Sequence, residues 1–236
     1  NILKNKIYFS LKHNLSMKNL PIYDVLDDIK TTLNTESTLI LEAPPGAGKS
    51  TVVPISLLNE SWLENKVIIM LEPRRVAVRM VAVQMAKLLG EEVGQSVGYQ
   101  VKMESCYSKQ TKLLVVTEAI LVRKLQSDQA LEDVAMVIFD EFHERSIHTD
   151  LSLALCLQVQ ELLRPDLKLL IMSATLDSNE LTNLLGKIPV INSKGKIYDV
   201  ENIYLETNIK QPDIKSINTL LLNITLKAIK EDEGDI

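Results

Sequence analysis

One short segment of the chain combines residue types that can hold a triphosphate. It reads Leu41-Glu-Ala-Pro-Pro-Gly-Ala-Gly-Lys-Ser-Thr51, follows an apolar run and opens a helical pattern. Backbone N–H groups must converge on the phosphate oxygens, so such a loop must curl tightly, which Gly46 and Gly48 permit. We therefore interpret this segment as a phosphate-binding loop.

The candidate nucleotide-binding residues belong to this loop and to the helix that we expect from Lys49. A helix start adds free N–H groups and the positive end of the helix dipole. Lys49 would reach the β- and γ-phosphates, and the Ser50 hydroxyl would ligate Mg²⁺. The full candidate set is Pro45, Gly46, Ala47, Gly48, Lys49, Ser50 and Thr51. The strict pattern begins with glycine where this chain has Ala43, and the alternative interpretation is a Gly/Pro turn with a chance lysine.

Two acidic residues, Asp140 and Glu141, form a second candidate site. They follow the apolar run 135–139, which we expect to be a strand, so they would leave the sheet at the same edge as the phosphate loop. Asp140 would hold Mg²⁺ through water, and Glu141 would act as the general base for an attacking water. Taken alone, such a pair could equally be a surface feature or a helix cap.

The elements that must position these residues alternate between strands and helices. Apolar runs predict strands, and apolar residues at helical spacing predict helices between them. The expected strands are 38–42, 67–71, 97–102, 113–116, 135–139 and 169–172, with a short later one at 203–205. The expected helices are 21–32, 49–58, 76–89, 120–126 and 150–163, with a last one that carries Ile217, Leu220, Leu221, Ile224 and Ala228 on one face. This order is typical of an α/β fold, a mostly parallel sheet with helices on both faces, which binds ligands at the carboxyl ends of its strands.

Composition narrows the class of protein. The longest clean apolar runs are of strand length, well short of the roughly 18 residues of a membrane span, so no membrane partner is expected. The two cysteines, Cys106 and Cys156, lack metal-ligand spacing and favour a reduced, cytoplasmic setting. A net charge of −5 and a pI near 5.4 argue against a protein that holds nucleic acid by bulk charge alone.

Five motifs in order carry a family resemblance. They are Ala43-Pro-Pro-Gly-Ala-Gly-Lys-Ser-Thr51, Glu72-Pro-Arg-Arg75, Thr117-Glu118, Asp140-Glu-Phe-His143 and Ser173-Ala-Thr175. Their order and spacing resemble those of motifs I, Ia, Ib, II and III in the DEAH-type superfamily 2 helicases. The resemblance runs from about Leu20 to the end of the chain. It implies a RecA-like P-loop NTPase domain, ATP and Mg²⁺ as cofactors, and single-stranded nucleic acid, RNA in preference to DNA, as partner.

The resemblance also implies roles for residues outside the nucleotide site. His143, Ser173 and Thr175 resemble residues that couple the nucleotide state to strand separation. Pro73, Arg74, Arg75 and Thr117 resemble positions that hold the phosphodiester backbone of a single strand. For the histidine a structural role, for the Ser/Thr pair an ordinary turn, and for the arginines salt bridges remain the alternatives. The sequence departs from the family pattern at two positions, which affects how these roles are assigned. Ala119 stands where relatives usually have glycine, and Gln84 stands where relatives often have an arginine that stacks on adenine.

The resemblance also suggests a domain organisation. We expect an amino-terminal extension at 1–16, the first RecA-like domain at 17–194, a linker at 195–213 and the start of a truncated second RecA-like domain at 214–236. That second domain supplies arginine fingers in the family, and no Gln-x-x-Gly-Arg-x-Gly-Arg pattern occurs in this sequence. We therefore expect this chain to bind nucleotide but to hydrolyse it poorly alone.

The function that we expect is the ATP-binding part of an ATP-dependent RNA helicase. Two other classes remain open. A P-loop ATPase acting on protein or small molecules would be indifferent to single-stranded nucleic acid. A binding module would hold nucleotide as a structural ligand, and its activity would survive Glu141→Gln.

Overall fold

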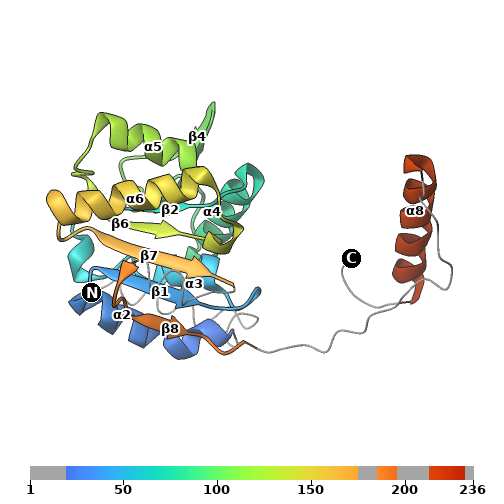
Figure 1. The fold of residues 1–236 in the computed structure, drawn as a ribbon, viewed down its shortest axis with the longest axis horizontal. Helices are drawn as coiled ribbons and strands as arrows, with labels where there is room; N and C mark the ends of the chain where they lie inside the picture. Colours follow the sequence, from blue (N-terminus) through green and yellow to red (C-terminus); the bar gives the residue numbers. More distant parts are fainter. Residues whose placement is uncertain (1–19, 175–184, 196–212, 232–236) are drawn as a thin grey trace. The chain divides into compact units, whose positions relative to one another are not determined.

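The computed structural model describes residues 20–174, 185–195 and 213–231, and in these ranges eight strands form one sheet (Figure 1). The strand order is β4-β3-β5-β2-β6-β7-β1-β8. The strands are β1 (Thr38–Glu42), β2 (Val67–Leu71), β3 (Val97–Val101), β4 (Glu104–Cys106), β5 (Leu113–Val116), β6 (Val134–Phe139), β7 (Lys168–Ser173) and β8 (Val190–Asn192). Neighbours pair in parallel, except for the antiparallel β3–β4 pair. The mostly parallel sheet that the sequence predicts is therefore confirmed.

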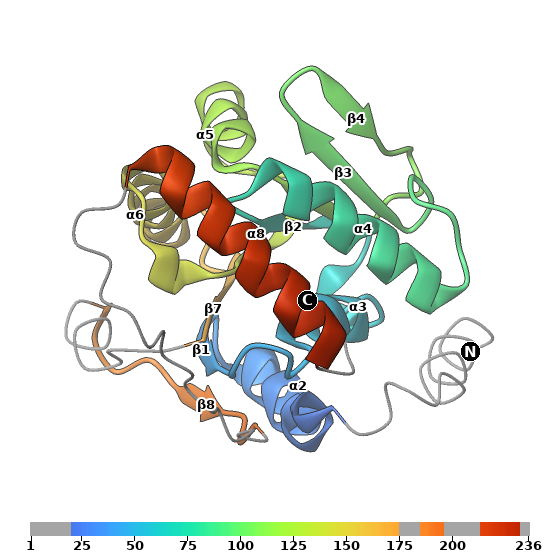
Figure 2. The same cartoon turned by 90° about the vertical axis from the view of Figure 1, so that its right-hand side faces the viewer.

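Helices cover both faces of this sheet, as Figures 1 and 2 show. The α-helices in this part of the chain are α2 (Leu26–Thr35), α3 (Lys49–Ser56), α4 (Arg75–Leu89), α5 (Glu118–Ser127) and α6 (Ile147–Leu162), and the 3₁₀ helices are η1 (Pro21–Val25), η2 (Ser61–Leu63) and η3 (Phe142–Glu144). A further helix, α8 (Ile214–Glu231), belongs to a separate unit of the chain. Residues of α2, α3 and α4 share one buried cluster, and residues of α5 and α6 share another. The two clusters lie on opposite faces of the sheet.

The apolar strands explain this three-layered arrangement. Side chains alternate along a strand, so Leu39 and Leu41 belong to the cluster under α2, α3 and α4, whereas Ile40 belongs to the other. All six residues of β6 are buried. Strands that are apolar at every position must be covered on both faces, which is what a parallel sheet with crossover helices provides. The sequence pattern thus predicts that β6, the strand that leads to Asp140, is covered on both faces.

An arginine outside the site joins several elements at the amino ends of the strands. The Arg164 guanidinium donates hydrogen bonds to the carbonyls of Ala130, Leu131 and Val134 at 3.2, 2.7 and 3.1 Å. It also forms a 2.7 Å ion pair with Asp166. These contacts hold the turn before β6 against the turn after α6, so they stabilise the strand from the end opposite to the acidic motif.

The sequence-based prediction missed two strands, β4 and β8. Both have only three residues and lie at the edges of the sheet, and β4 reads Glu104-Ser-Cys106 with no apolar run. The first turn of the predicted helix 21–32 is a 3₁₀ helix, η1. The predicted strand 203–205 lies outside the described residues. Short edge strands are specified by their neighbours more than by their own side chains, so their sequences carry little signal.

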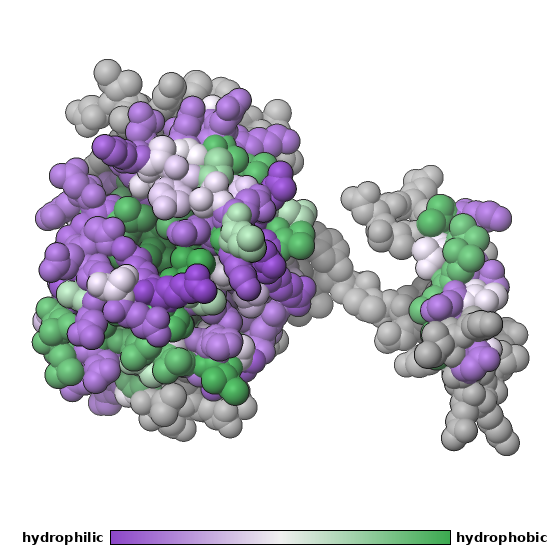
Figure 3. Space-filling model, turned by 90° about the horizontal axis from the view of Figure 1, so that it is seen from above, coloured by the Kyte–Doolittle hydropathy of each residue, from purple (hydrophilic) through white to green (hydrophobic). Residues whose placement is uncertain are grey.

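The chain divides into two compact units, residues 1–196 and 197–236, and α8 is the described element of the second. The domain boundaries expected from the sequence stay predictions. Within the described ranges, no helix combines the length and the apolar character needed to cross a membrane. The face of the first unit seen in Figure 3 is mainly hydrophilic, with smaller hydrophobic areas between the polar residues.

Candidate functional site

The phosphate loop lies between the end of β1 and the start of α3. Gly46 and Gly48 have φ angles of 77° and 95°, in the left-handed region that favours glycine. A Cβ atom on Gly48 would also lie 2.8 Å from Cδ1 of Leu20. Gly48 is the N-cap residue of α3, so the first turn of the helix comes directly after the loop. The N–H groups of this first turn have no acceptor inside the helix. This geometry is suited to an anionic ligand.

Ala43, the departure from the strict loop pattern, is accommodated without strain. It is fully buried, and its N–H donates to the Ser173 carbonyl at 3.0 Å. Among the described residues, those with positive φ do not include Ala43. Since the backbone at this position does not need the freedom of glycine, the substitution leaves the curl at Gly46 and Gly48 unaffected.

Lys49 and Glu141 are in direct contact. Nζ of Lys49, whose side chain is 5% exposed, lies 2.8 Å from Oε1 of Glu141. The sequence separates these residues widely, and the sheet brings them together because β1 and β6 end at the same edge. A triphosphate at Lys49 would replace the carboxylate as partner of the ammonium group. Glu141 would then be available to accept a proton from water.

Asp140 and Ser50 form a site that fits Mg²⁺. Burial raises the pKa of Asp140 to about 6, although a hydrogen bond from Ser50 and the charge of Lys49 act in the opposite direction. Its Oδ1 accepts the Glu141 N–H at 2.9 Å, and its buried Oδ2 has no hydrogen-bond partner within the described part of the chain. Mg²⁺ is commonly held by one carboxylate together with substrate phosphates, and such an ion would satisfy this oxygen.

Glu72, at the end of β2, is a buried carboxyl to which the sequence analysis gave no role. It is 4% exposed and directly follows β2, which pairs with β6. Burial raises its pKa to about 8, the charge of Asp140 adds to this, and a hydrogen bond from the Arg74 N–H opposes it. The sequence did contain a signal for such a role, because Glu72 stands between an apolar strand and a proline. That position lies at the carboxyl end of its strand, the same sheet edge as the acidic motif.

The raised pKa of Glu72 predicts a pH-dependent stability. Between pH 4.5 and about 8 the unfolded chain loses the Glu72 proton while the folded chain retains it, so this group makes folding less favourable as pH rises. Glu72→Gln keeps an acceptor for the Arg74 N–H and cannot ionise. We expect its advantage over wild type in the free energy of unfolding to grow by at least about 1.4 kcal/mol between pH 5 and pH 8.

Urea denaturation without nucleotide or Mg²⁺ measures this difference, with Glu132→Gln on the surface as the matched control. An advantage that is the same at both pH values would contradict the assignment of Glu72 as a buried, protonated group.

The candidate nucleic-acid residues lie at the same sheet edge. Pro73, Arg74 and Arg75 follow β2, and Thr117 follows the adjacent strand β5. Arg74 and Thr117 are the N-cap residues of α4 and α5. Nη2 of Arg74 lies 2.6 Å from Oε1 of Glu144, and Nη2 of Arg75 donates to the Lys102 carbonyl at 3.1 Å. Both arginines are exposed, so a phosphodiester could reach them.

The two departures in this region have different consequences. Ala119 lies inside α5, and the described residues with positive φ do not include it, so the fold does not require glycine there. Gln84 is exposed on α4, nine residues after the helix start at Arg75. At a rise of 1.5 Å per residue, it lies about 14 Å along the helix from Arg75. A role for Gln84 in base recognition stays a prediction.

His143 connects the acidic motif with the segment after β7. The Ala174 N–H lies 3.3 Å from Nδ1 of His143, and Oε2 of Glu141 lies 3.4 Å from the same nitrogen. When Nδ1 carries no proton, it can accept a hydrogen bond from the Ala174 N–H. When Nδ1 carries a proton, it can instead donate a hydrogen bond to Glu141. Ser173, the last residue of β7, is fully buried. Thr175 lies outside the described residues.

Glu118, a carboxylate for which the sequence predicts no role, contacts the residues that end the segment between the acidic motif and α6. It accepts hydrogen bonds from the hydroxyls of Ser146, at 2.8 Å, and Thr149. Ser146 in turn caps α6 by accepting the Thr149 N–H at 3.0 Å. The start of α5, beside Thr117, is thereby tied to the start of α6. A Ser-x-x-Thr capping pattern signals the helix start, but not its link to Glu118.

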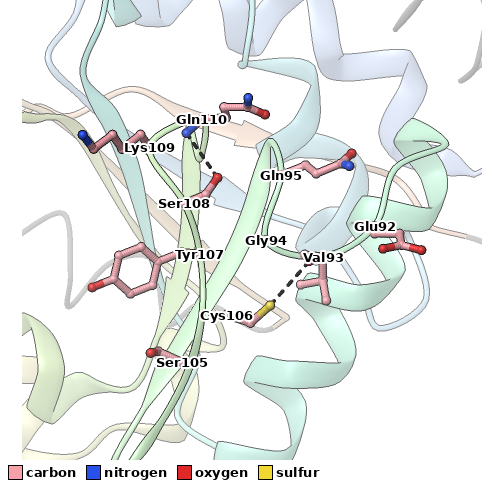
Figure 4. Close-up of a pocket in the computed structure, with 10 residues that line it drawn as sticks. All are labelled: Glu92, Val93, Gly94, Gln95, Ser105, Cys106, Tyr107, Ser108, Lys109 and Gln110. Carbon is pink, nitrogen blue, oxygen red and sulfur yellow. Dashed lines mark hydrogen bonds between the residues drawn. The ribbon is translucent and has the colours of Figure 1, made fainter.

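An open pocket of about 760 Å³ lies elsewhere, between the turn before β3 and the segment after β4 (Figure 4). Its lining includes Gly94, Cys106 and Lys109, and the Cys106 thiol donates to the Val93 carbonyl at 3.4 Å. The turn at Gly94 precedes β3, so the pocket lies at the amino end of that strand. The phosphate loop and the acidic motif lie at the carboxyl ends and share none of its lining residues.

Comparisons with known proteins agree with this geometry. The chain is 49% identical over 220 residues to the Escherichia coli (strain K12) ATP-dependent RNA helicase HrpB, covering 93% of this chain and 27% of HrpB. It is 36% identical over 202 residues to the Mus musculus ATP-dependent RNA helicase DHX29, covering 81% of this chain and 15% of DHX29. The chain therefore spans about a quarter or less of the length of these relatives.

Solved structures give the same result for the fold. The crystal structure of the E. coli DEAH/RHA helicase HrpB matches with a TM-score of 0.82 at 44% identity, covering 92% of this chain and 27% of that one. A crystal structure described as E. coli DExH-box NTPase HrpB matches with a TM-score of 0.77 at 43% identity, covering 94% and 27%. The predicted RecA-like α/β fold is confirmed. Residues 26–184 match the DEAD/DEAH box helicase family, and this chain belongs to that family.

Proposed function

We propose that this chain is the ATP-binding domain of an ATP-dependent RNA helicase, in which Mg²⁺-dependent ATP hydrolysis drives movement along nucleic acid or its unwinding. The observation that carries the proposal is the 2.8 Å contact between Lys49 and Glu141 beside the buried carboxylate of Asp140. Candidate groups for phosphate binding, metal binding and water activation thus meet at one sheet edge. The exposed Arg74 and Arg75, which follow the neighbouring strand β2, lie at the same edge.

In this proposal the phosphate loop and the acidic motif divide the chemistry. The loop amides and Lys49 would hold the phosphates, and Ser50 and Asp140 would hold Mg²⁺. Glu141 accepts a proton from the attacking water. The nucleotide-binding set is Pro45, Gly46, Ala47, Gly48, Lys49, Ser50 and Thr51. A bound Mg²⁺ would neutralise charge that develops on the phosphate oxygens.

A second group of residues would communicate with the nucleic acid. Pro73, Arg74, Arg75 and Thr117 hold the backbone of a single strand, because arginine side chains and helix starts both favour phosphate. His143, Ser173 and Thr175 couple nucleotide state to strand movement. RNA is favoured over DNA because HrpB and DHX29 are both named ATP-dependent RNA helicases.

The proposal includes parts outside these 236 residues. A second RecA-like domain in the same polypeptide would supply arginine fingers, which contribute about 10³–10⁵ to turnover in related phosphoryl-transfer enzymes. Two cysteines without metal-ligand spacing favour a cytoplasmic setting.

Steady-state ATP hydrolysis by the longer protein, with and without single-stranded RNA or DNA, tests this function. We expect RNA to stimulate turnover and removal of Mg²⁺ to abolish it. Arg75→Ala should raise the RNA concentration needed for half-maximal stimulation by about tenfold, the effect of losing one good phosphate contact. Turnover that neither nucleic acid changes would favour an ATPase that acts on protein or small molecules.

A further inference from the structure

The short segment between β6 and α6 carries, besides Asp140, two carboxylates that are each paired with a cation suited to phosphate. Glu141 contacts Lys49, the proposed partner of the ATP phosphates, at 2.8 Å. Glu144 contacts Arg74, a proposed partner of the nucleic-acid backbone, at 2.6 Å. Each carboxylate therefore stands where a phosphate oxygen of one of the two ligands would bind.

These two carboxylates belong to one compact turn. The Glu144 N–H donates to the Glu141 carbonyl at 2.9 Å, which closes the 3₁₀ turn η3. Phe142, inside this turn, is 3% exposed and packs edge-on against Phe139, with ring centroids 6.4 Å apart. One hydrogen-bonded turn therefore carries both groups, with a buried anchor between them.

The backbone at both ends of the turn is strained. Glu141 and Arg145 have φ angles of 48° and 40°, which non-glycine residues rarely adopt. Such a conformation persists only where surrounding contacts hold it. Here the contacts include the Lys49–Glu141 pair, the two hydrogen bonds from Arg145 to Asp150 and the hydrogen bond from Ser146 to Glu118. The exposed Arg74–Glu144 pair adds a small contribution.

The Arg74–Glu144 pair is accessible to a competing ligand. The Arg74 side chain is 73% exposed and that of Glu144 is 32% exposed. Ion pairs in such surroundings contribute little to stability, because water screens them. A phosphodiester can therefore displace Glu144 from Arg74 without a large cost.

We propose that Glu144 is a positioning residue that occupies Arg74 until a nucleic-acid phosphate replaces it, and that its release frees the turn that carries Glu141. This inference rests on the proposed function. It gives a physical route by which RNA stimulates hydrolysis: ATP displaces one carboxylate of the turn and RNA displaces the other. Because binding free energies are reciprocal, each ligand should also favour binding of the other.

Glu144→Gln in the longer protein tests this route. We expect ATP hydrolysis without RNA to rise about two- to fivefold, the range that corresponds to one exposed ion pair. The RNA concentration for half-maximal stimulation should fall by a similar factor, because the competitor of the phosphate has lost its charge. Arg74→Ala should likewise raise RNA-free hydrolysis, since it breaks the same pair, but it should weaken RNA binding.

A double-mutant cycle separates this role from a general structural one. If both residues act through one contact, Glu144→Gln combined with Arg74→Ala should give no more RNA-free hydrolysis than either change alone. Asp133→Asn is the matched control, because it removes a surface ion pair with Lys124 at 2.8 Å before the opposite end of β6. We expect that variant to behave as wild type.

Two different results would overturn separate parts of the account. If RNA stimulates wild type but Glu144→Gln changes neither RNA-free hydrolysis nor RNA affinity, Glu144 has no positioning role and the proposed function stands. If RNA does not stimulate wild type, the proposed function fails, and the inference fails with it. Each variant should unfold at the same midpoint temperature as wild type, which checks that the fold is retained.

Discussion

Glu141→Gln is expected to lower the turnover of ATP in the longer protein by about 10³-fold while nucleotide binding is retained. The amide has the shape of the carboxylate and still accepts a hydrogen bond from Lys49, which lies 2.8 Å from Oε1. It cannot accept a proton from water. Single-turnover hydrolysis measures the chemical step, and equilibrium binding of ATP measures the affinity.

The matched control for this variant is Glu132→Gln, an exposed glutamate near the other end of β6. It changes the net charge by the same amount, and we expect wild-type turnover. If Glu141→Gln retained its turnover, water activation would lie elsewhere in the site. That result would favour the binding module in which nucleotide is a structural ligand.

Lys49→Ala is expected to remove both nucleotide affinity and turnover, with a fall in kcat/KM of at least about 10³-fold. Its ammonium group is the buried cation at the start of α3, and nothing else in the loop 45–48 carries a positive charge. Glu141, whose side chain is 25% exposed, would turn to solvent after the change, so the fold should be retained. ATP binding and steady-state kinetics with the longer protein give the two effects separately.

Lys66→Ala is the appropriate comparison, because it removes another lysine that is paired with a carboxylate, at 3.2 Å from Asp166. That pair lies at the amino end of β2, away from the phosphate loop. Unchanged turnover in Lys66→Ala and near-complete loss in Lys49→Ala would support the loop assignment. Equal activity in both variants would remove its basis.

The sequence predicted the central sheet well, because its strands are unusually apolar. β1, β2 and β5 begin and end at the predicted residues, and β6 differs by one residue at its start. These strands are buried on both faces, so their own side chains determine where they lie. The parallel strands then place their carboxyl ends at one edge, which is why residues far apart in sequence could be assigned to one site.

Contacts between elements could not be predicted in the same way. The ion pair between Arg74 and Glu144 joins residues 70 positions apart. The hydrogen bonds of Glu118 to Ser146 and Thr149 likewise depend on how the starts of α5 and α6 meet. A sequence shows that these residues are polar and near helix starts, but the partner of each depends on tertiary packing.

Burial of single carboxyl groups was equally hidden. Glu72 and Asp140 both follow apolar strands, and both could have been exposed caps. The structure buries them to 4% and 2% exposure just after the neighbouring strands β2 and β6, and burial raises both pKa values. The strand order, which no periodic pattern reveals, is what brings them together.

The most direct test of the central proposal compares this chain with the longer protein. ATP hydrolysis would be measured for each, with and without single-stranded RNA, with Lys49→Ala as the blank and ATP binding by the short chain as a parallel measurement. We predict that the short chain binds ATP with little turnover, and that the longer protein turns over and is stimulated by RNA. A short chain that hydrolyses ATP as fast as the longer protein, with no response to RNA, would contradict the account.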